Sequence, residues 1–434
     1  MAATAGLTGC IAALTSCGNA YRPVVATVGL VGPAGQPQKY AIAVASPSPA
    51  SPGLMTMVDF SGDTVLVTAT MGVNPYYLAL STSGTTGFTL NSDDTVTSFD
   101  ISPSLLSSNV LQSTLPTGSK PVTLFSTTTN TYIPDSGVNA IDQLTGTPAA
   151  LKQELPVTPG YTPVYVVGAQ SSARIYALTQ ATNNGPGEAL AIETNGNTIS
   201  AHLPMGSAPI YGVMSADGRR VFVMNQGSNT VSVINSQTNA LDSTPTIPVG
   251  TKPVWGDMAS GLNELVVANQ GDGTSPGSVT IVNVPLCTAT TLPTNPNCNP
   301  SNPIDATTFG QVLATVPVGI NPIMVTVLSD YSRAYVANAG QAGLPCSSTG
   351  VAVPGVTTTC TVSVVNLTTN TVTATIPIQG HPAWIASSNA SPTGKIYVVC
   401  KDSQVMTVIE TDTDSVDTTI PLQGYGVSVR TTAP

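Results

Sequence analysis

A proline that stands two or three residues after a glycine recurs along this chain of 434 residues and divides it into units of similar length. These prolines are Pro75, Pro121, Pro163, Pro209, Pro253, Pro322 and Pro382. Four of the six gaps between them span 42 to 46 residues, and the other two span 69 and 60. A period of this length indicates a fold of repeated supersecondary units, each of which buries its apolar faces against its neighbours.

The unit between Pro209 and Pro253 contains four short apolar runs separated by residues typical of tight turns. The runs are IYGVM, RRVFVMN after Asp217 and Gly218, NTVSVIN, and a last run that ends TIPVG. Alternation with a period of two, broken by Gly and Asn, predicts antiparallel strands joined by hairpin turns. Four strands in roughly 40–50 residues are typical of a β-propeller blade.

Each of the two long gaps contains a pair of cysteines, so we expect insertions at about 284–310 and 341–360. Cys287 and Cys298 are 11 residues apart, and Cys346 and Cys360 are 14 apart. Neither spacing is that of a CxxC metal site, and no histidine is near either pair in the sequence, so we expect two loop-closing disulfides. Such disulfides indicate an oxidising compartment outside the cytoplasm. Cys400 stands in an apolar run and is expected to be buried in a strand.

Three of the expected strands are similar to the motif that names a repeat family. They read ELVVANQG at 264–271, RAYVANAG at 333–340 and KIYVVCKD at 395–402, and strands such as those at 361–366 and 371–377 follow them. In these residues the chain resembles the YVTN family of β-propeller repeat proteins, over nearly its whole length after about Lys39. The resemblance implies the fold and a bacterial or archaeal surface protein. Related propellers include lactonases and lyases, so the resemblance is a weaker guide to the function than to the fold.

Eight candidate fourth strands predict eight blades, with seven as the alternative because seven is commoner in that family and the first unit diverges. The first unit has three candidate strands, at 39–46, 53–60 and 64–70, and lacks a first strand. Residues 425–429 provide a spare strand at the other end of the chain. Pairing it with the first three would close the ring and remove both open sheet edges. We therefore predict an all-β propeller of four-stranded antiparallel blades at 39–434.

Residues 1–17 are small and apolar and resemble the export signal of a bacterial lipoprotein. The segment LTSC ends at Cys17, which is the residue expected to carry the lipid, and LTGC ending at Cys10 has the same pattern. No Lys or Arg precedes the apolar run, in contrast to the usual signal, so the true start is left open. Residues 18–38 are expected to be a linker. We expect an extracytoplasmic protein, in the periplasm, outer membrane or cell surface, that contacts the membrane only through this anchor.

Charged residues make up only 8% of the chain, against about a quarter in an ordinary soluble domain. The formal net charge is −10, with only 12 basic residues, so the chain offers no surface for a phosphate backbone and nucleic acid is excluded as a partner. A hydrophobic content of 41% is too high for a disordered chain. Because charged residues are so rare in this chain, few of them remain for catalysis or ion binding.

The sequence contains no motif that predicts catalytic residues, a metal site or a cofactor. The two histidines, His202 and His381, occupy repeat positions at which other units have other residues, and they form no HExxH pattern. Neither a GxSxG elbow nor a phosphate loop occurs. Asp412, Asp414 and Asp417 have a spacing similar to a calcium loop but lack its Gly and its final Glu, so we interpret them as a solvated turn.

Aromatic residues gather two positions after the hinge prolines, although aromatics are only 5% of the chain. They are Tyr77, Tyr165, Tyr211, Trp255 and Trp384, and the other units have Thr123, Met324 and Ser428 at this position. The position begins the first strand, which in a propeller lies nearest the axis. Flat rings beside Ser, Thr and Asn suit sugars or other neutral ligands, whereas the alternative is that the rings pack between blades as core. Asp257, on the strand of Trp255, is the best charged candidate for the channel.

These observations favour an exported, surface-attached propeller that acts as a binding or structural scaffold, with a glycan or another surface protein as its partner. The alternative is an enzyme of the lactonase or lyase kind with its active site in the axial channel. That alternative requires two or three polar side chains from different blades to meet in the channel. The sequence does not determine the oligomeric state.

Overall fold

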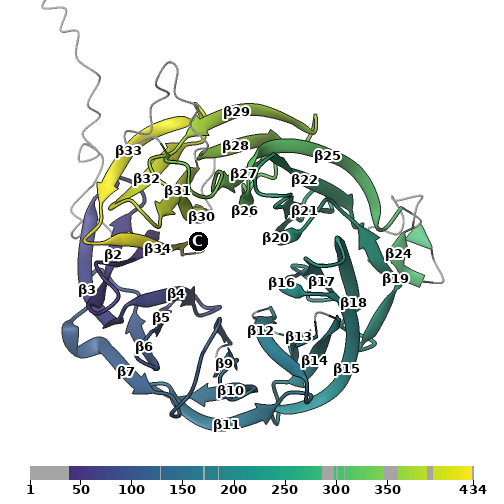
Figure 1. Ribbon diagram of the computed structural model, residues 1–434, viewed down its shortest axis with the longest axis horizontal. Helices are drawn as coiled ribbons and strands as arrows, with labels where there is room; N and C mark the ends of the chain where they lie inside the picture. Colours follow the sequence, from purple (N-terminus) through teal and green to yellow (C-terminus); the bar gives the residue numbers. More distant parts are fainter. Residues whose placement is uncertain are drawn as a thin grey trace, which may run out of the picture. The chain divides into compact units, whose positions relative to one another are not determined.

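The computed structural model describes residues 39–127, 129–169, 172–183, 185–285, 308–346, 360–388 and 394–432, together with the backbone of 298–299 and 302–306. Within these residues the chain forms eight four-stranded antiparallel sheets arranged as the blades of a ring (Figure 1). The predicted eight-bladed propeller is confirmed, and the seven-bladed alternative is wrong.

The blades are numbered in chain order. Blade 1 contains β1 (Tyr40–Ser46), β2 (Pro52–Asp59), β3 (Val65–Val73) and β34 (Tyr425–Thr431). Blade 2 contains β4 (Pro75–Leu80), β5 (Thr86–Asn91), β6 (Thr95–Asp100) and β7 (Val110–Thr114). Blade 3 contains β8 (Phe125–Ser126), β9 (Asn130–Asp135), β10 (Ala140–Thr145) and β11 (Ala150–Pro156). Blade 4 contains β12 (Tyr161–Val167), β13 (Arg174–Ala181), β14 (Pro186–Glu193) and β15 (Thr198–Ser207).

Blade 5 contains β16 (Pro209–Met214), β17 (Arg220–Asn225), β18 (Thr230–Asn235) and β19 (Ala240–Pro248). Blade 6 contains β20 (Pro253–Ala259), β21 (Glu264–Asn269), β22 (Pro276–Asn283) and β25 (Gln311–Ile320). Blade 7 contains β26 (Pro322–Val327), β27 (Arg333–Asn338), β28 (Thr361–Asn366) and β29 (Thr371–Pro377). Blade 8 contains β30 (Pro382–Ser387), β31 (Lys395–Cys400), β32 (Val405–Glu410) and β33 (Ser415–Pro421).

Blade 1 closes the ring, because it combines the two ends of the described chain. Its strand order is β3-β2-β1-β34, and β34 pairs antiparallel with β1 so that Ala43 lies opposite Val429. Figure 1 shows β34, in yellow, beside the purple strands of the first unit. The predicted closure by the C-terminal strand is therefore confirmed. Pairing of β1 on both sides leaves no open edge on this strand.

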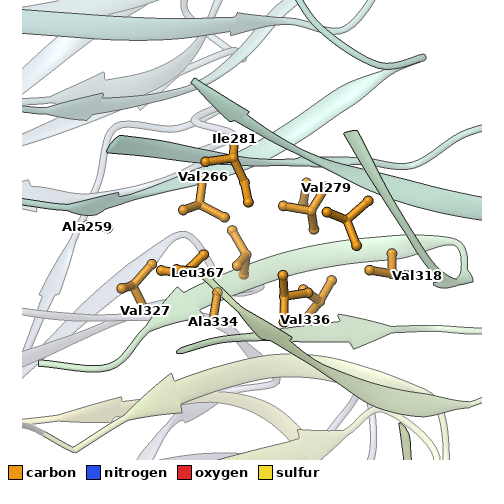
Figure 2. Packing of buried hydrophobic residues seen from close by; sticks show 13 residues of the cluster. Ala259, Val266, Val279, Ile281, Val318, Val327, Ala334, Val336 and Leu367 are labelled. Carbon is orange, nitrogen blue, oxygen red and sulfur yellow. The ribbon is translucent and has the colours of Figure 1, made fainter. Parts of the chain in front are cut away.

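Apolar side chains on both faces of each blade hold the ring together. The second strands β17, β21 and β31 are buried at every position, since each is sandwiched between neighbouring blades. Figure 2 shows one such contact, in which Val266 and Ile281 of blade 6 face Val327, Ala334 and Val336 of blade 7. The fourth strands lie on the outside of the ring in Figure 1, and in β15 exposed residues alternate with half-buried or buried ones over most of its length. This difference explains the continuous apolar runs of the second strands and the Thr-rich fourth strands.

A buried asparagine at the end of the second strand explains the repeated glycine. Asn269 is 1% exposed, and its amide donates a hydrogen bond of 3.0 Å to the hydroxyl of Thr280 on the third strand. A Cβ added to Gly250, just before the hinge Pro253, would lie 2.7 Å from the Asn269 side chain. The same pairing of a glycine with a buried asparagine occurs as Gly72 with Asn91, Gly206 with Asn225, and Gly319 with Asn338. In blade 8 Cys400 takes the asparagine position, opposite Pro382.

The predicted disulfide between Cys346 and Cys360 is present, with the two Cα atoms 5.3 Å apart. Cys287 lies outside the described residues, so its disulfide with Cys298 stays a prediction, as does the lipid on Cys17. Cys400 is buried and free, as expected of a strand residue.

A few short elements lie outside the blades. β23 (Cys298–Asn299) and β24 (Asn302–Ala306) form a small separate sheet between β22 and β25, and η2 (Ser107–Asn109) is a 3-10 turn. Within the described residues no helix has the length and apolar character needed to cross a membrane.

Candidate functional site

A β-bulge at the start of the first strand sets the direction of the side chain two residues after the hinge proline. In β20 the pairing with β21 shifts between Pro253 and Trp255. The same shift occurs in β4, β12, β16, β26 and β30. An extra residue on one strand bends it and turns the next side chain, which here begins the innermost strand. Blade 3 departs from the pattern, because β8 starts at Phe125 and Thr123 precedes it.

The five predicted aromatic residues come together near the axis, and we call them the aromatic array. Tyr211 and Trp255 stack with ring centroids 3.7 Å apart and planes 22° apart, and Tyr165 lies 4.8 Å from Tyr211. Trp255 meets Trp384 edge to face at 5.3 Å, and Trp384 meets Tyr77 edge to face at 5.9 Å. Strands from blades 2, 4, 5, 6 and 8 therefore contribute to one continuous set of rings.

Both interpretations of these rings describe part of the array. Tyr77 is only 8% exposed and packs into the core between blades. The other four rings are half-buried, and Trp384 also packs against three of the apolar clusters between blades. Burial raises the pKa of Tyr165 and of Tyr211, so both hydroxyls keep their protons at neutral pH. The array is thus part of the core, with four half-buried rings whose tyrosine hydroxyls are neutral.

A pocket of about 300 Å³ lies against the aromatic array. Its wall includes Tyr211, Trp255, Trp384 and Asp257, which are four of the six candidate ligand-binding residues. Tyr77 and Tyr165 do not line it. The pocket is lined by residues of β16, β20, β26, β30 and β34. Figure 1 shows these strands at the inner side of the ring, so the pocket that they line is axial. Its volume is at the lower end of the roughly 300–1,000 Å³ typical of small-molecule sites.

Asp257 places a carboxyl group in this pocket without a charged hydrogen-bond partner among the described residues. Its Oδ1 accepts a hydrogen bond from the backbone N–H of Met258 at 2.8 Å, and its Oδ2 accepts one from Val327, also at 2.8 Å. Burial raises the pKa of Asp257 to about 6, and the two hydrogen bonds act against this rise. A carboxyl group with this pKa exchanges a proton near neutral pH, as a general base must.

Arg430 lines the pocket too, although it was not predicted as a site residue. Its guanidinium carbon lies 4.0 Å from the ring centroid of Trp384 and 5.8 Å from that of Tyr77. Its Nε donates a hydrogen bond of 3.1 Å to the carbonyl of Leu78. The sequence contained one signal for this residue. Arg430 is two residues after Ser428, which holds the position of the aromatic residues in this unit, and side chains two positions apart on a strand lie on the same face. The pocket thus contains one basic and one acidic side chain beside its rings.

Hydroxyl groups complete the polar part of the pocket wall. Thr326 and Ser387 join β26 and β30 through a hydrogen bond of 2.8 Å between their hydroxyls. The hydroxyl of Thr431 donates to the backbone carbonyl of Ser387 at 2.6 Å. These groups link blades 7, 8 and 1 around the pocket, and they are the kind of neutral donor and acceptor that fixes a ligand's orientation.

The histidines and the acidic turn lie away from this pocket. His202 Nδ1 is 2.5 Å from Glu188 Oε1 on the outer strands of blade 4. Asp414 is not a solvated turn residue as predicted, because it accepts hydrogen bonds from Tyr335 and, at 2.7 Å, from Arg333 of blade 7. His381 lies beside the Cys346–Cys360 disulfide, although no histidine is near that pair in the sequence.

No model of a known protein family matches the chain, and no curated protein matches it. Solved structures of similar fold include apo AztD from Citrobacter koseri, with a TM-score of 0.58 and 13% identity over 91% of this chain and 97% of that chain. The dihydro-heme d1 dehydrogenase NirN in complex with DHE has a TM-score of 0.62 and 12% identity over 91% of this chain and 75% of its own. A Bacteroides fragilis protein, provisionally assigned as a 6-phosphogluconolactonase, has a TM-score of 0.54 and 12% identity over 92% of this chain and 99% of its own. At these identities the likeness shows the propeller fold alone.

Proposed function

We propose that this chain is an exported β-propeller that binds a neutral, ring-shaped ligand such as a glycan in the axial pocket. The observation that carries the proposal is the junction of the stacked Tyr211 and Trp255 rings with hydroxyl groups from neighbouring blades. An apolar ring face takes the face of a sugar ring, while hydroxyls exchange hydrogen bonds with its edge. The small volume favours one sugar ring at a time over a long chain of sugars.

The two tryptophans of the chain provide the direct test, because both line the pocket. Glycans are first selected by their binding to the protein on a glycan microarray. The selected glycans are then titrated into the protein while tryptophan emission is recorded. We expect saturable changes in emission, and we expect Trp255→Ala and Trp384→Ala to abolish binding on the glycan microarray. Tyr161→Ala is a matched control, since Tyr161 is on β12 but outside the aromatic array. Glycan binding that is unchanged in both tryptophan variants would contradict the proposal, provided that circular dichroism shows that the variants keep the β-sheet content of the parent protein.

Attachment to the outside of the cell is a separate part of the proposal. The disulfide between Cys346 and Cys360 supports an oxidising compartment, and the LTSC segment supports lipid on Cys17. The test is labelling of cells with a radioactive fatty acid. We expect label on the parent protein in the membrane fraction and none on Cys17→Ala. Equal label on the two proteins would contradict the anchor.

Catalysis of the lactonase or lyase kind is the second candidate, and Asp257 is the observation that favours it. Its pKa of about 6 suits a general base, and Arg430 in the same pocket could stabilise a developing negative charge. Asp257→Asn distinguishes the candidates. An enzyme would lose turnover of lactone or uronate substrates and keep binding, whereas a binding protein shows no turnover with either form.

A further inference from the structure

Two neighbouring blades bring three metal-ligating side chains to one place. Cys346 follows β27 and Cys360 precedes β28, both in blade 7, while His381 stands just before β30 of blade 8. One ligand atom from each of the three lies within 4.8 Å of the others. Cys360 is fully buried, and the other two are half-buried. This cluster is separate from the axial pocket.

The histidine is oriented in the way that metal ligands commonly are. His381 Nδ1 lies 2.6 Å from Asp402 Oδ2, and the backbone N–H of His381 donates a second bond of 2.6 Å to Asp402 Oδ1. The first bond occupies Nδ1, so in the neutral imidazole Nε2 is the ring nitrogen left to bind a metal. A carboxylate that holds one ring nitrogen while the other binds a metal is a recurrent arrangement. A disulfide alone has no need of such an oriented imidazole.

The other repeats of the chain lack a histidine at the position of His381, which supports a specific role for His381 beside the two cysteines. At the other hinge prolines the preceding residue is Asn74, Lys120, Thr162, Ala208, Lys252 or Asn321, and a histidine stands at this position only in the blade that follows the Cys346–Cys360 insertion. The glycine before it is also constrained, because a Cβ on Gly380 would lie 2.6 Å from Asp402 Oδ1. Histidine, carboxylate and the close backbone therefore occur together in this blade.

We propose that Cys346, Cys360 and His381 form a redox-gated zinc site, in which a disulfide and a zinc ion exclude each other. Two thiolates and one imidazole are a donor set that Zn²⁺ accepts, with a fourth position left for water. In the disulfide form neither sulfur is a thiolate, so this form cannot provide the two sulfur ligands. A dithiol reductant supplies two electrons and two protons, which cleave the S–S bond to two thiols while the reductant becomes a disulfide. Zinc then displaces the two thiol protons into water.

The test compares zinc binding to the oxidised and reduced forms of the full chain. Cys10, Cys17, Cys287 and Cys298 are changed to Ser so that only the proposed pair and the buried Cys400 can respond. The protein is reduced with a dithiol, freed of reductant by anaerobic gel filtration, and titrated with Zn²⁺ against a chelating dye. We expect one zinc per chain in the reduced form and none in the oxidised form. Cobalt in place of zinc should give the thiolate charge-transfer absorption of a tetrahedral site.

Single changes separate ligands from neighbours. His381→Gln should weaken zinc binding at least tenfold and alter the cobalt spectrum, and Asp402→Asn should weaken it about 10- to 100-fold. His202→Gln is the matched control, because His202 also contacts a carboxylate but lies on the outer strands of blade 4. Equal zinc binding by both redox forms, or by His381→Gln and the parent, would overturn the proposal. Loss of the fold on reduction that zinc does not restore, followed by circular dichroism, would overturn it as well.

Discussion

The guanidinium of Arg430 lies over the indole of Trp384 at 4.0 Å, and this contact joins the last strand of the chain to the blade before it. Arg430 reaches the pocket only because β34 pairs with β1. One side of the pocket wall is therefore complete only when the ring is closed. Ligand binding and ring closure should depend on each other for this reason.

Arg430→Met should destabilise the protein by about 1–3 kcal/mol, because it removes a cation–π contact and a charged hydrogen bond to the Leu78 carbonyl. Arg430→Lys should restore only part of this, since an ammonium group lacks the flat guanidinium fork. Urea unfolding measures the change in the free energy of unfolding. Lys401→Met, which removes an exposed cation, serves as the control. Full recovery with Lys would contradict the role given to the guanidinium plane.

Tryptophan emission should titrate with a midpoint near pH 6, because Asp257 shares the pocket with both tryptophans and its pKa is raised to about 6. Asp257→Asn should remove this transition. Burial raises the pKa, so the folded protein holds the proton more tightly than the unfolded chain. The contribution of Asp257 to stability should therefore fall as the pH rises from about 4 to about 6. An unchanged transition in the Asn variant would assign the signal to another group.

Asn269→Leu should cost about 1–3 kcal/mol, because it removes the side-chain amide that donates to the Thr280 hydroxyl and leaves that hydroxyl only the backbone N–H of Gly250 as a donor. A double-mutant cycle with Thr280→Val measures the coupling between the two side chains from thermal or urea unfolding. We expect the double variant to be less destabilised than the sum of the single ones. Gln237→Leu, at an exposed turn, should be close to neutral. Additive effects would mean that the pair is not coupled.

Asp142→Asn should stabilise the protein at pH 8 and have little effect at pH 4. Burial, together with the nearby charges of Asp135 and Glu154, raises the pKa of Asp142 to about 7. The folded state therefore binds the proton more tightly, and stability is lost as the pH rises from about 4 to about 7. We expect the Tm at pH 8 to rise by roughly 2–4 °C, measured by calorimetry. The exposed Asp412→Asn should show no such pH dependence.

Features that depend on neighbouring residues could be predicted from the sequence. The hinge prolines, the alternating runs and the spare strand at 425–429 predicted eight blades and their closure, and all three are local patterns. The position two after the hinge predicted the aromatic array, because the same bulge turns Tyr211, Trp255 and Trp384 toward the axis. Packing between blades could not be predicted in the same way. The turn at Asp414 looked solvated until blade 7 brought Arg333 to within 2.7 Å of it.

The sequence by itself determined the repeat unit, the strand order within each blade and the residue types at the axis. These follow from turn residues and from the period of apolar side chains, which act over a few positions of the chain. Only the tertiary structure decided that Arg430 joins the pocket and that His381 lies beside Cys346 and Cys360. Both contacts cross from one blade to the next. They depend on how whole sheets pack and on ring closure, which no local pattern of residues encodes.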